Sequence, residues 1–305
     1  MAALVTGRRA DLLDPADVAS LGGIELVARA VVEGFLAGLH RSPFRGFSVE
    51  FAEHRPYQPG DELRYLDWKI LARRDRLYVK QYEEETNLRA TLVLDVSRSM
   101  AWAGRSDRLT KHAYAVRLAA AMAYVLLRQR DATGLIAFDD AVRVAVPPKA
   151  RSGQWPLLAA ELAGLEPGGG TAAEPALRRV TDLLRRRGMA IFVSDLLVER
   201  ELVLTALRYL RHRGHAVTVL HVMDPGEWEL EPGQEARFVD PETGEGVVAA
   251  PRDLRRDYHE TVDRVVRAWR RACRGSGLDY HHVTTTTPFG HVLRRLAARD
   301  ARVPR

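Results

Sequence analysis

The sequence of 305 residues is poor in cysteine, in lysine and in long apolar runs, and each shortage excludes a class of protein. Cys273 is the only cysteine, which excludes an intramolecular disulfide and a thiolate metal cluster. No stretch reaches the roughly 18–20 apolar residues that a membrane-spanning helix needs. The N-terminus carries acids where a signal peptide has its apolar core. We therefore expect a cytoplasmic protein with no membrane span.

The basic excess is almost entirely arginine. Only four of the 46 basic residues are lysines, although the net charge is +6 and the pI is near 9.6. Many arginines fall on the polar faces of expected helices, as in LRRVTDLLRRR. A nucleic-acid footprint should instead gather on one surface. We therefore expect no nucleic-acid binding, and salt-sensitive binding to DNA would contradict this.

The chain divides into two expected parts. Residues 1–86 predict a small α+β region, with helical spacing over 15–40 and strand patterns at 46–57 and 77–82. Residues 87–305 alternate between strand and helix patterns, which predicts an α/β fold. We expect a Rossmann-like, doubly wound and mostly parallel sheet with helices on both faces. Its predicted strands are 88–96, 133–140, 142–148 (an antiparallel edge strand), 189–196, 216–224 and 278–286.

The segment LVLDVSRSM (92–100) carries the most informative pattern. An apolar, strand-like run stops at Asp95 and is followed by hydroxyls at Ser97 and Ser99. Open α/β sheets bind their ligands at the carboxyl ends of strands, where this loop should lie. Three oxygen side chains on one loop suit a hard cation that takes oxygen ligands.

Two further residues are placed where a shared site would need them. Thr171 ends the glycine-rich loop EPGGGT, and Asp195 ends the apolar strand pattern MAIFVSD. A magnesium ion takes near-octahedral oxygen ligands at about 2.1 Å and usually keeps several waters. Two aspartates would balance its charge, while the neutral hydroxyls would leave the ion electrophilic. A vacant or water-filled position could then accept a partner's carboxylate.

These five residues resemble the metal-ion-dependent adhesion site of von Willebrand factor A-like domains. The Asp-x-Ser-x-Ser, Thr and Asp elements of that site match, in order, Asp95, Ser97, Ser99, Thr171 and Asp195. The resemblance implies a von Willebrand factor A-like fold and a site for Mg²⁺, Mn²⁺ or Ca²⁺. It also implies protein–protein interaction through that ion.

The stretch PGDELRYLDWKILARRDRLYVKQYEEE (59–85) resembles the signature of a bacterial family known as domain of unknown function 58. The resemblance runs from about Pro43 to Asp224 and includes the EWEL and DPETGE segments. Members are commonly encoded beside MoxR-type AAA+ ATPases. The resemblance therefore implies such an ATPase, or another protein presenting Asp or Glu, as a partner. Many relatives have N-terminal membrane helices, which we do not expect here.

Other interpretations of these residues stay open. Ser97 and Ser99 can cap a turn, and Asp95 can bond backbone amides. GGGT lacks the lysine of a phosphate-binding loop. His281 and His282 are neighbours on one strand, so they should face opposite ways rather than pair at a metal.

We thus expect a non-enzymatic adaptor that docks an acidic residue of a partner on a metal. The alternative is a metal-dependent hydrolase or phosphatase with Asp95 as nucleophile. That chemistry needs an acid or base beside the nucleophile, and no histidine lies within the three ligand segments.

Overall fold

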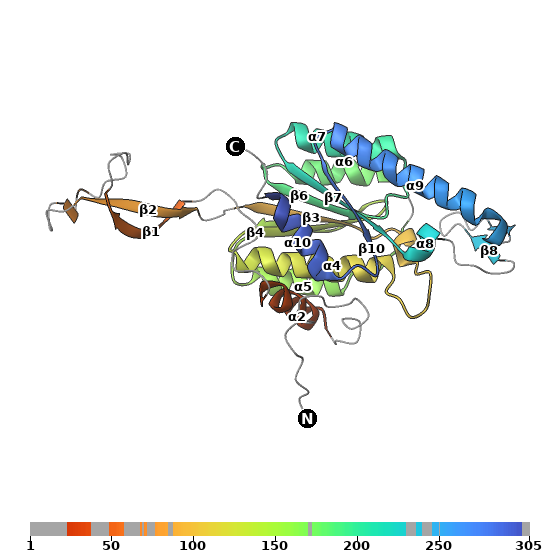
Figure 1. Cartoon of the computed structure of the whole chain (residues 1–305), viewed down its shortest axis with the longest axis horizontal. Coiled ribbons are helices and arrows are strands. Elements are labelled where there is room, and N and C mark those ends of the chain that lie inside the picture. Colours follow the sequence, from red (N-terminus) through yellow and green to blue (C-terminus); the bar gives the residue numbers. More distant parts are fainter. Residues whose placement is uncertain are drawn as a thin grey trace, which may run out of the picture.

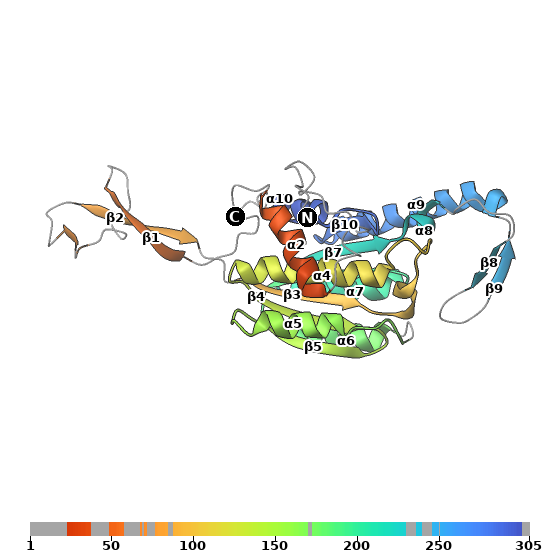
Figure 2. The ribbon, with the colours of Figure 1, turned by 90° about the horizontal axis from the view of Figure 1, so that it is seen from below.

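Figures 1 and 2 show a computed structural model of the chain. The structure describes residues 23–37, 49–57, 68, 70–71, 77–84, 88–169, 173–229, 236–239, 246–249 and 251–300.

A six-stranded sheet forms the centre of the molecule (Figure 1). In spatial order its strands are β10 (Asp279–Thr284), β7 (Ala216–Met223), β6 (Met189–Ser194), β3 (Arg89–Asp95), β4 (Ala132–Phe138) and β5 (Val142–Lys149). Neighbouring strands run parallel, except that β5 pairs with β4 antiparallel. The expected α/β fold, with its mostly parallel sheet and antiparallel edge strand, is confirmed.

The burial of each strand follows its place in the sheet. In β3, every residue after Arg89 is buried, as expected for a central strand covered on both faces. Its alternate residues enter two different cores: Leu92 and Leu94 pack on one side, and Val93 on the other. The edge strand β5 instead alternates between exposed and half-buried residues over most of its length.

Helices cover both faces of the sheet, as Figures 1 and 2 show. The core on one face is formed with α2 (Ile24–Ala37), α4 (Lys111–Arg128), α5 (Gln154–Ala163) and α10 (Phe289–Asp300). The core on the other face is formed with α6 (Ala173–Leu183), α7 (Arg200–His212) and α9 (Pro251–Gly275). Helix α2 lies within the helical spacing predicted over 15–40, and the other helices belong to the strand–helix alternation predicted for 87–305.

Helix α2 belongs to the core of the α/β domain. Val27, Ala28, Val31 and Val32 are buried at helical spacing, in one cluster with α4 and the sheet. The sequence pattern had placed this helix in a separate region, residues 1–86, because the spacing of its apolar residues does not show which elements it packs against. The division of the chain at residue 86 stays a prediction.

Two hairpins project from opposite ends of the sheet in Figures 1 and 2. One pairs β1 (Val49–Pro56) with β2 (Tyr78–Glu84), close to both strand predictions. The other pairs β8 (Ala236–Val239) with β9 (Gly246–Ala249), after the short helix α8 (Pro225–Glu229). None of the described helices is long and apolar enough to cross a membrane.

Candidate metal-binding site

Four adjacent parallel strands of the sheet lead directly into aspartates. β3 ends in Asp95, and Asp139, Asp195 and Asp224 follow β4, β6 and β7. All four side chains are buried at the carboxyl edge of the sheet. Because buried carboxylates need compensating charge or hydrogen bonds, the partners of each aspartate decide what this edge can bind.

The loop after β3 gathers three of the predicted ligands. The backbone N–H of Ser97 donates to Asp95 Oδ1 at 2.9 Å, and the hydroxyl oxygens of Ser97 and Ser99 lie 3.1 Å apart. A short 3₁₀ helix, Arg98–Ala101, begins inside the loop and buries Ser99. All three side chains therefore lie together beneath the surface, as a shared oxygen site requires.

Ser194 connects this loop to Asp195. Its hydroxyl donates to Asp95 Oδ2 at 2.6 Å and accepts the N–H of Leu196 at 2.9 Å. Asp195 Oδ1 accepts the N–H of Leu197 at 3.2 Å. Leu196 has a φ of 56°, a left-handed conformation uncommon outside glycine, so these bonds hold a constrained turn.

Thr171 lies outside the described residues, but the loop that leads to it is described up to Gly169. The N–H of Gly168 donates to the carbonyl of Val96 at 2.9 Å, which attaches this loop to the Asp95 loop. Gly169 has a φ of +69°, and a Cβ there would lie 2.4 Å from an Asp139 carboxylate oxygen. The approach is therefore open only to glycine.

Sequence reasoning missed Lys111, the first residue of α4. Its side chain is fully buried, and Nζ lies 2.8 Å from Asp195 Oδ2 and also contacts the carboxylate of Glu227. Burial alone would lower the pKa of Lys111, but the two carboxylates together raise it, so the ammonium stays charged. The only signal in the sequence was a lysine in a chain whose basic residues are nearly all arginine.

Asp95 differs from the other three aspartates because no basic side chain of the described residues pairs with it. Arg143 pairs with Asp139, Arg108 with Asp224, and Lys111 with Asp195. Burial and the nearby Asp195 carboxylate raise the pKa of Asp95 to about 6. This buried carboxylate is thus destabilised by its surroundings and would be stabilised by a cation.

The donor set fits a divalent ion. When all groups are ionised, the carboxylates of Asp95, Asp195 and Glu227, with the single Lys111 ammonium, leave two negative charges uncompensated. Within the described residues, no group of three or more His, Cys, Asp or Glu side chains could hold a metal. The ion would therefore depend on hydroxyl ligands, as Ser97 and Ser99 supply.

Two large apolar side chains stand exposed next to the site. Trp102 follows the Asp95 loop and is 41% exposed, and Leu197 follows Asp195 and is 60% exposed. Exposed apolar side chains beside polar groups are typical of contact surfaces in proteins.

The strand order, the antiparallel edge strand and the Asp-x-Ser-x-Ser loop together define a von Willebrand factor A-like domain. The chain belongs to the family described as "Protein of unknown function DUF58", which matches residues 53–267. It is 32% identical over 243 residues to the uncharacterized proteins Rv1480 of Mycobacterium tuberculosis and Mb1516 of Mycobacterium bovis. Each match covers 77% of this chain and 74% of the relative.

Solved structures are similar at lower identity. The hypothetical protein BatB from Bacteroides thetaiotaomicron matches 71% of this chain and 100% of its own, at 15% identity and a TM-score of 0.47. The VWA domain of SpRpn10 matches 70% of this chain and 95% of its own, at 11% identity and a TM-score of 0.37. These likenesses are weak, and the strand order defines the fold without them.

Proposed function

We propose that the chain is a non-enzymatic adaptor that docks an acidic residue of a partner protein on a bound divalent metal. The observation that carries this proposal is Asp95, a buried carboxylate without a basic partner in the described structure, beside the hydroxyls of Ser97 and Ser99. A carboxylate in this setting needs a cation, and hydroxyl ligands leave that cation attractive to a further carboxylate.

Asp95, Ser97, Ser99 and Thr171 are the residues that would hold the ion. Asp195 would contribute directly or through water, since Lys111 already contacts its Oδ2. The ion, Mg²⁺ in the first instance and Mn²⁺ or Ca²⁺ as alternatives, supplies a positive charge that attracts the partner's carboxylate. Trp102 and Leu197 would contact the residues that flank this carboxylate.

The partner we propose is a MoxR-type AAA+ ATPase in the cytoplasm, as the family resemblance implies. This matches a chain in which none of the described helices could span a membrane.

A hydrolase with Asp95 as nucleophile has less support. His221 hydrogen-bonds to the backbone of Asp195, but burial lowers its pKa to about 3, and its Nδ1 lies 2.7 Å from the Tyr280 hydroxyl. A general base should have a pKa nearer the working pH and reach the substrate. His221 therefore favours the adaptor over the hydrolase.

The test has two stages on the full chain. Calorimetric titration with Mg²⁺, Mn²⁺ and Ca²⁺ first measures metal binding by wild type, Asp95→Ala and Ser97→Ala. Binding to the purified ATPase is then measured with Mg²⁺ and with chelator. Asp107→Ala serves as the control, because Asp107 lies on the next loop, exposed and paired with Arg105.

We expect both site variants to lose metal and partner binding while staying folded, and Asp107→Ala to retain both. Partner binding by Asp95→Ala at wild-type strength would refute the adhesion mechanism. Metal binding without any partner binding, together with turnover of phosphate esters by wild type alone, would favour the hydrolase.

A further inference from the structure

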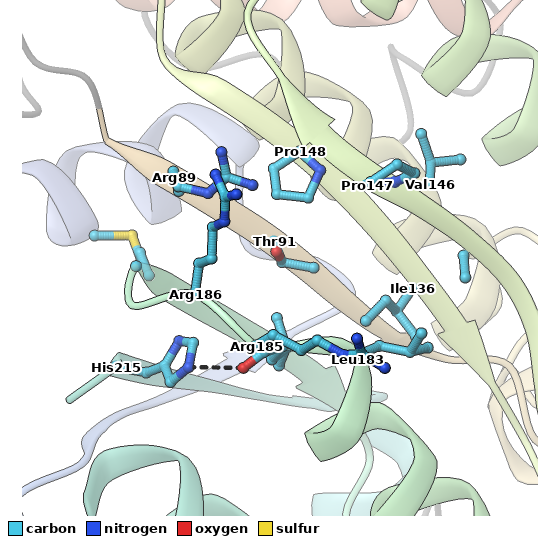
Figure 3. A pocket seen from close by; sticks show the side chains of 14 residues that line it. Arg89, Thr91, Ile136, Val146, Pro147, Pro148, Leu183, Arg185, Arg186 and His215 are labelled. Atoms are coloured by element: carbon cyan, nitrogen blue, oxygen red, sulfur yellow. Dashed lines mark hydrogen bonds between the residues drawn. The ribbon is translucent and has the colours of Figure 1, made fainter. Parts of the chain in front are cut away.

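A cavity of about 360 Å³ lies at the amino edge of the sheet, opposite the candidate metal site. Figure 3 shows it between Arg89 and Thr91 of β3, Pro147 and Pro148 of β5, and the turn after α6. Strands β3, β6 and β7 begin here and end at the aspartates, so the length of the strands separates the two sites.

Main-chain geometry shapes this cavity. Helix α6 ends at Leu183, and residues 184–188 return to the sheet without regular structure. On the other side, a Cβ on Gly134 would lie 2.6 Å from the carbonyl oxygen of Val146 and 2.7 Å from the nitrogen of Pro148. This close approach, and a proline that cannot donate to β4, fix the path of β5 along the cavity. The path of the backbone on both sides therefore positions the side chains that line the cavity.

The cavity is basic. The described residues that line it include Arg89, Arg185 and Arg186, and no Asp or Glu is among them. In the described part of the chain, none of these three guanidinium groups pairs with a carboxylate. Arginines elsewhere in the fold do form such pairs, as Arg108 does with Asp224. Figure 3 shows the Arg186 side chain extending toward Arg89. Guanidinium groups placed near one another attract an anion and bind carboxylate or phosphate in a bidentate manner.

The remaining walls are apolar, apart from Thr91 and His215. Ile136, Val146 and Leu183 provide apolar surface. His215 is buried, its Nε2 donates to the carbonyl of Leu184 at 3.0 Å, and its Nδ1 has no partner in the described structure. Burial lowers the pKa of His215, so the ring is neutral near pH 7 and Nδ1 is an acceptor. This imidazole adds no charge to the cavity, so its charge comes from the arginines.

We propose that this cavity binds a small organic anion, with a carboxylate or phosphate held by Arg89 and Arg186 and an apolar body against Ile136, Val146 and Leu183. The volume lies at the small end of the range for small-molecule pockets. The inference does not depend on the metal site, so either can fail alone.

The experiment measures binding to the full chain by calorimetry with three eight-carbon probes and inorganic phosphate. Octanoate and octyl phosphate carry the two head groups, octanol carries neither, and inorganic phosphate has no apolar body. We expect one or both anionic octyl probes to bind at least about tenfold more tightly than octanol and phosphate, since a charge-assisted hydrogen bond contributes at least that factor. The anionic probe that binds more tightly identifies the preferred head group.

Two adjacent arginines provide a matched control. Arg186 lines the cavity and Arg187 does not, so Arg186→Glu and Arg187→Glu change the net charge equally. We expect Arg186→Glu to weaken binding about tenfold or more, and Arg187→Glu to change it less than about twofold. Ala145→Trp should fill the cavity and abolish binding, whereas Ala160→Trp on the exposed face of α5 should not.

Several outcomes would overturn the proposal. Failure of both anionic octyl probes to bind at millimolar concentration would do so. So would equal losses in the two arginine variants, which would indicate general charge attraction. Unchanged binding in folded Ala145→Trp would place the ligand elsewhere, and equal binding of phosphate and octyl phosphate would remove the role of the apolar walls.

Discussion

Lys111 Nζ lies 2.8 Å from Asp195 Oδ2, although 84 positions separate the two residues in the sequence. The contact joins the first turn of α4 to the carboxyl end of β6 and buries an ammonium group at the edge where the metal is proposed. A metal at Asp95 and the ammonium of Lys111 would therefore share Asp195. The positive charge of Lys111 stabilises the two carboxylates in the absence of metal and opposes the binding of a metal cation beside it.

Lys111→Met should separate these two effects. Without metal, the variant leaves Asp195 and Glu227 uncompensated, and the free energy of unfolding should fall by about 3–5 kcal/mol. With the ammonium gone, Mg²⁺ affinity should rise at least about tenfold, because a nearby positive charge is removed. Urea unfolding in chelator and calorimetric titration with Mg²⁺ measure the two quantities.

Lys149→Met is the control, since Lys149 is exposed at the end of β5 and should change neither quantity. A folded Lys111→Met protein with weaker Mg²⁺ affinity would contradict the shared use of Asp195.

Ser194→Ala should weaken metal binding although Ser194 was not among the predicted ligands. Its hydroxyl donates to Asp95 Oδ2 at 2.6 Å and accepts the N–H of Leu196 at 2.9 Å. Without this hydroxyl, neither the carboxylate nor the turn is fixed in place. Loss of a residue that orients a ligand typically costs 10–100-fold in metal affinity, and we expect about tenfold or more. Ser276→Ala is the control. The Ser276 hydroxyl, just after α9, also donates one hydrogen bond and accepts another, so its removal should leave the metal affinity unchanged. Equal affinities in the two variants would show that Ser194 does not position Asp95.

The order of strands and helices could be predicted because apolar periodicity is a local signal. It placed Asp95 and Asp195 at strand ends, and parallel pairing of β3 with β6 then brought them together. Lys111 and Glu227 could not be found in this way, because neither lies at the end of a strand: Lys111 begins α4 and Glu227 lies in α8. Ser194 was hidden for a different reason: inside an apolar strand pattern, a serine gives no sign of its hydrogen-bond partner.

The half-buried imidazole of His282 should make folding stability depend on pH. Burial, with Arg270 and Arg295 nearby, lowers its pKa to about 4, and its Nε2 has no partner in the described structure. An unfolded histidine titrates near 6.5, so between these values the unfolded chain binds more protons than the folded one. Stability should therefore fall as the pH drops from about 6.5 toward 4.

His282→Leu should reduce this loss by about 2–3 kcal/mol, measured by urea unfolding at pH 7 and at the lowest pH where the protein stays folded. The exposed His212 is the control, and His212→Leu should keep the wild-type pH dependence. If His282→Leu loses as much stability as wild type on acidification, another group must cause the dependence.

Two adjacent glycines test whether the loop before Thr171 must approach the metal site closely. Gly169 has a φ of +69° and would place a Cβ 2.4 Å from an Asp139 carboxylate oxygen, whereas a Cβ on Gly168 meets nothing within 4 Å.

Gly169→Ala must therefore accept a left-handed backbone, at about 1–2 kcal/mol, or move the loop and disturb the ion pair between Asp139 and Arg143. We expect Mg²⁺ affinity to fall about tenfold in Gly169→Ala and to change little in Gly168→Ala, as a loss of about 1.4 kcal/mol implies. Equal affinities in calorimetric titrations of both variants would mean that the metal does not depend on this loop, and Thr171 would then be no ligand.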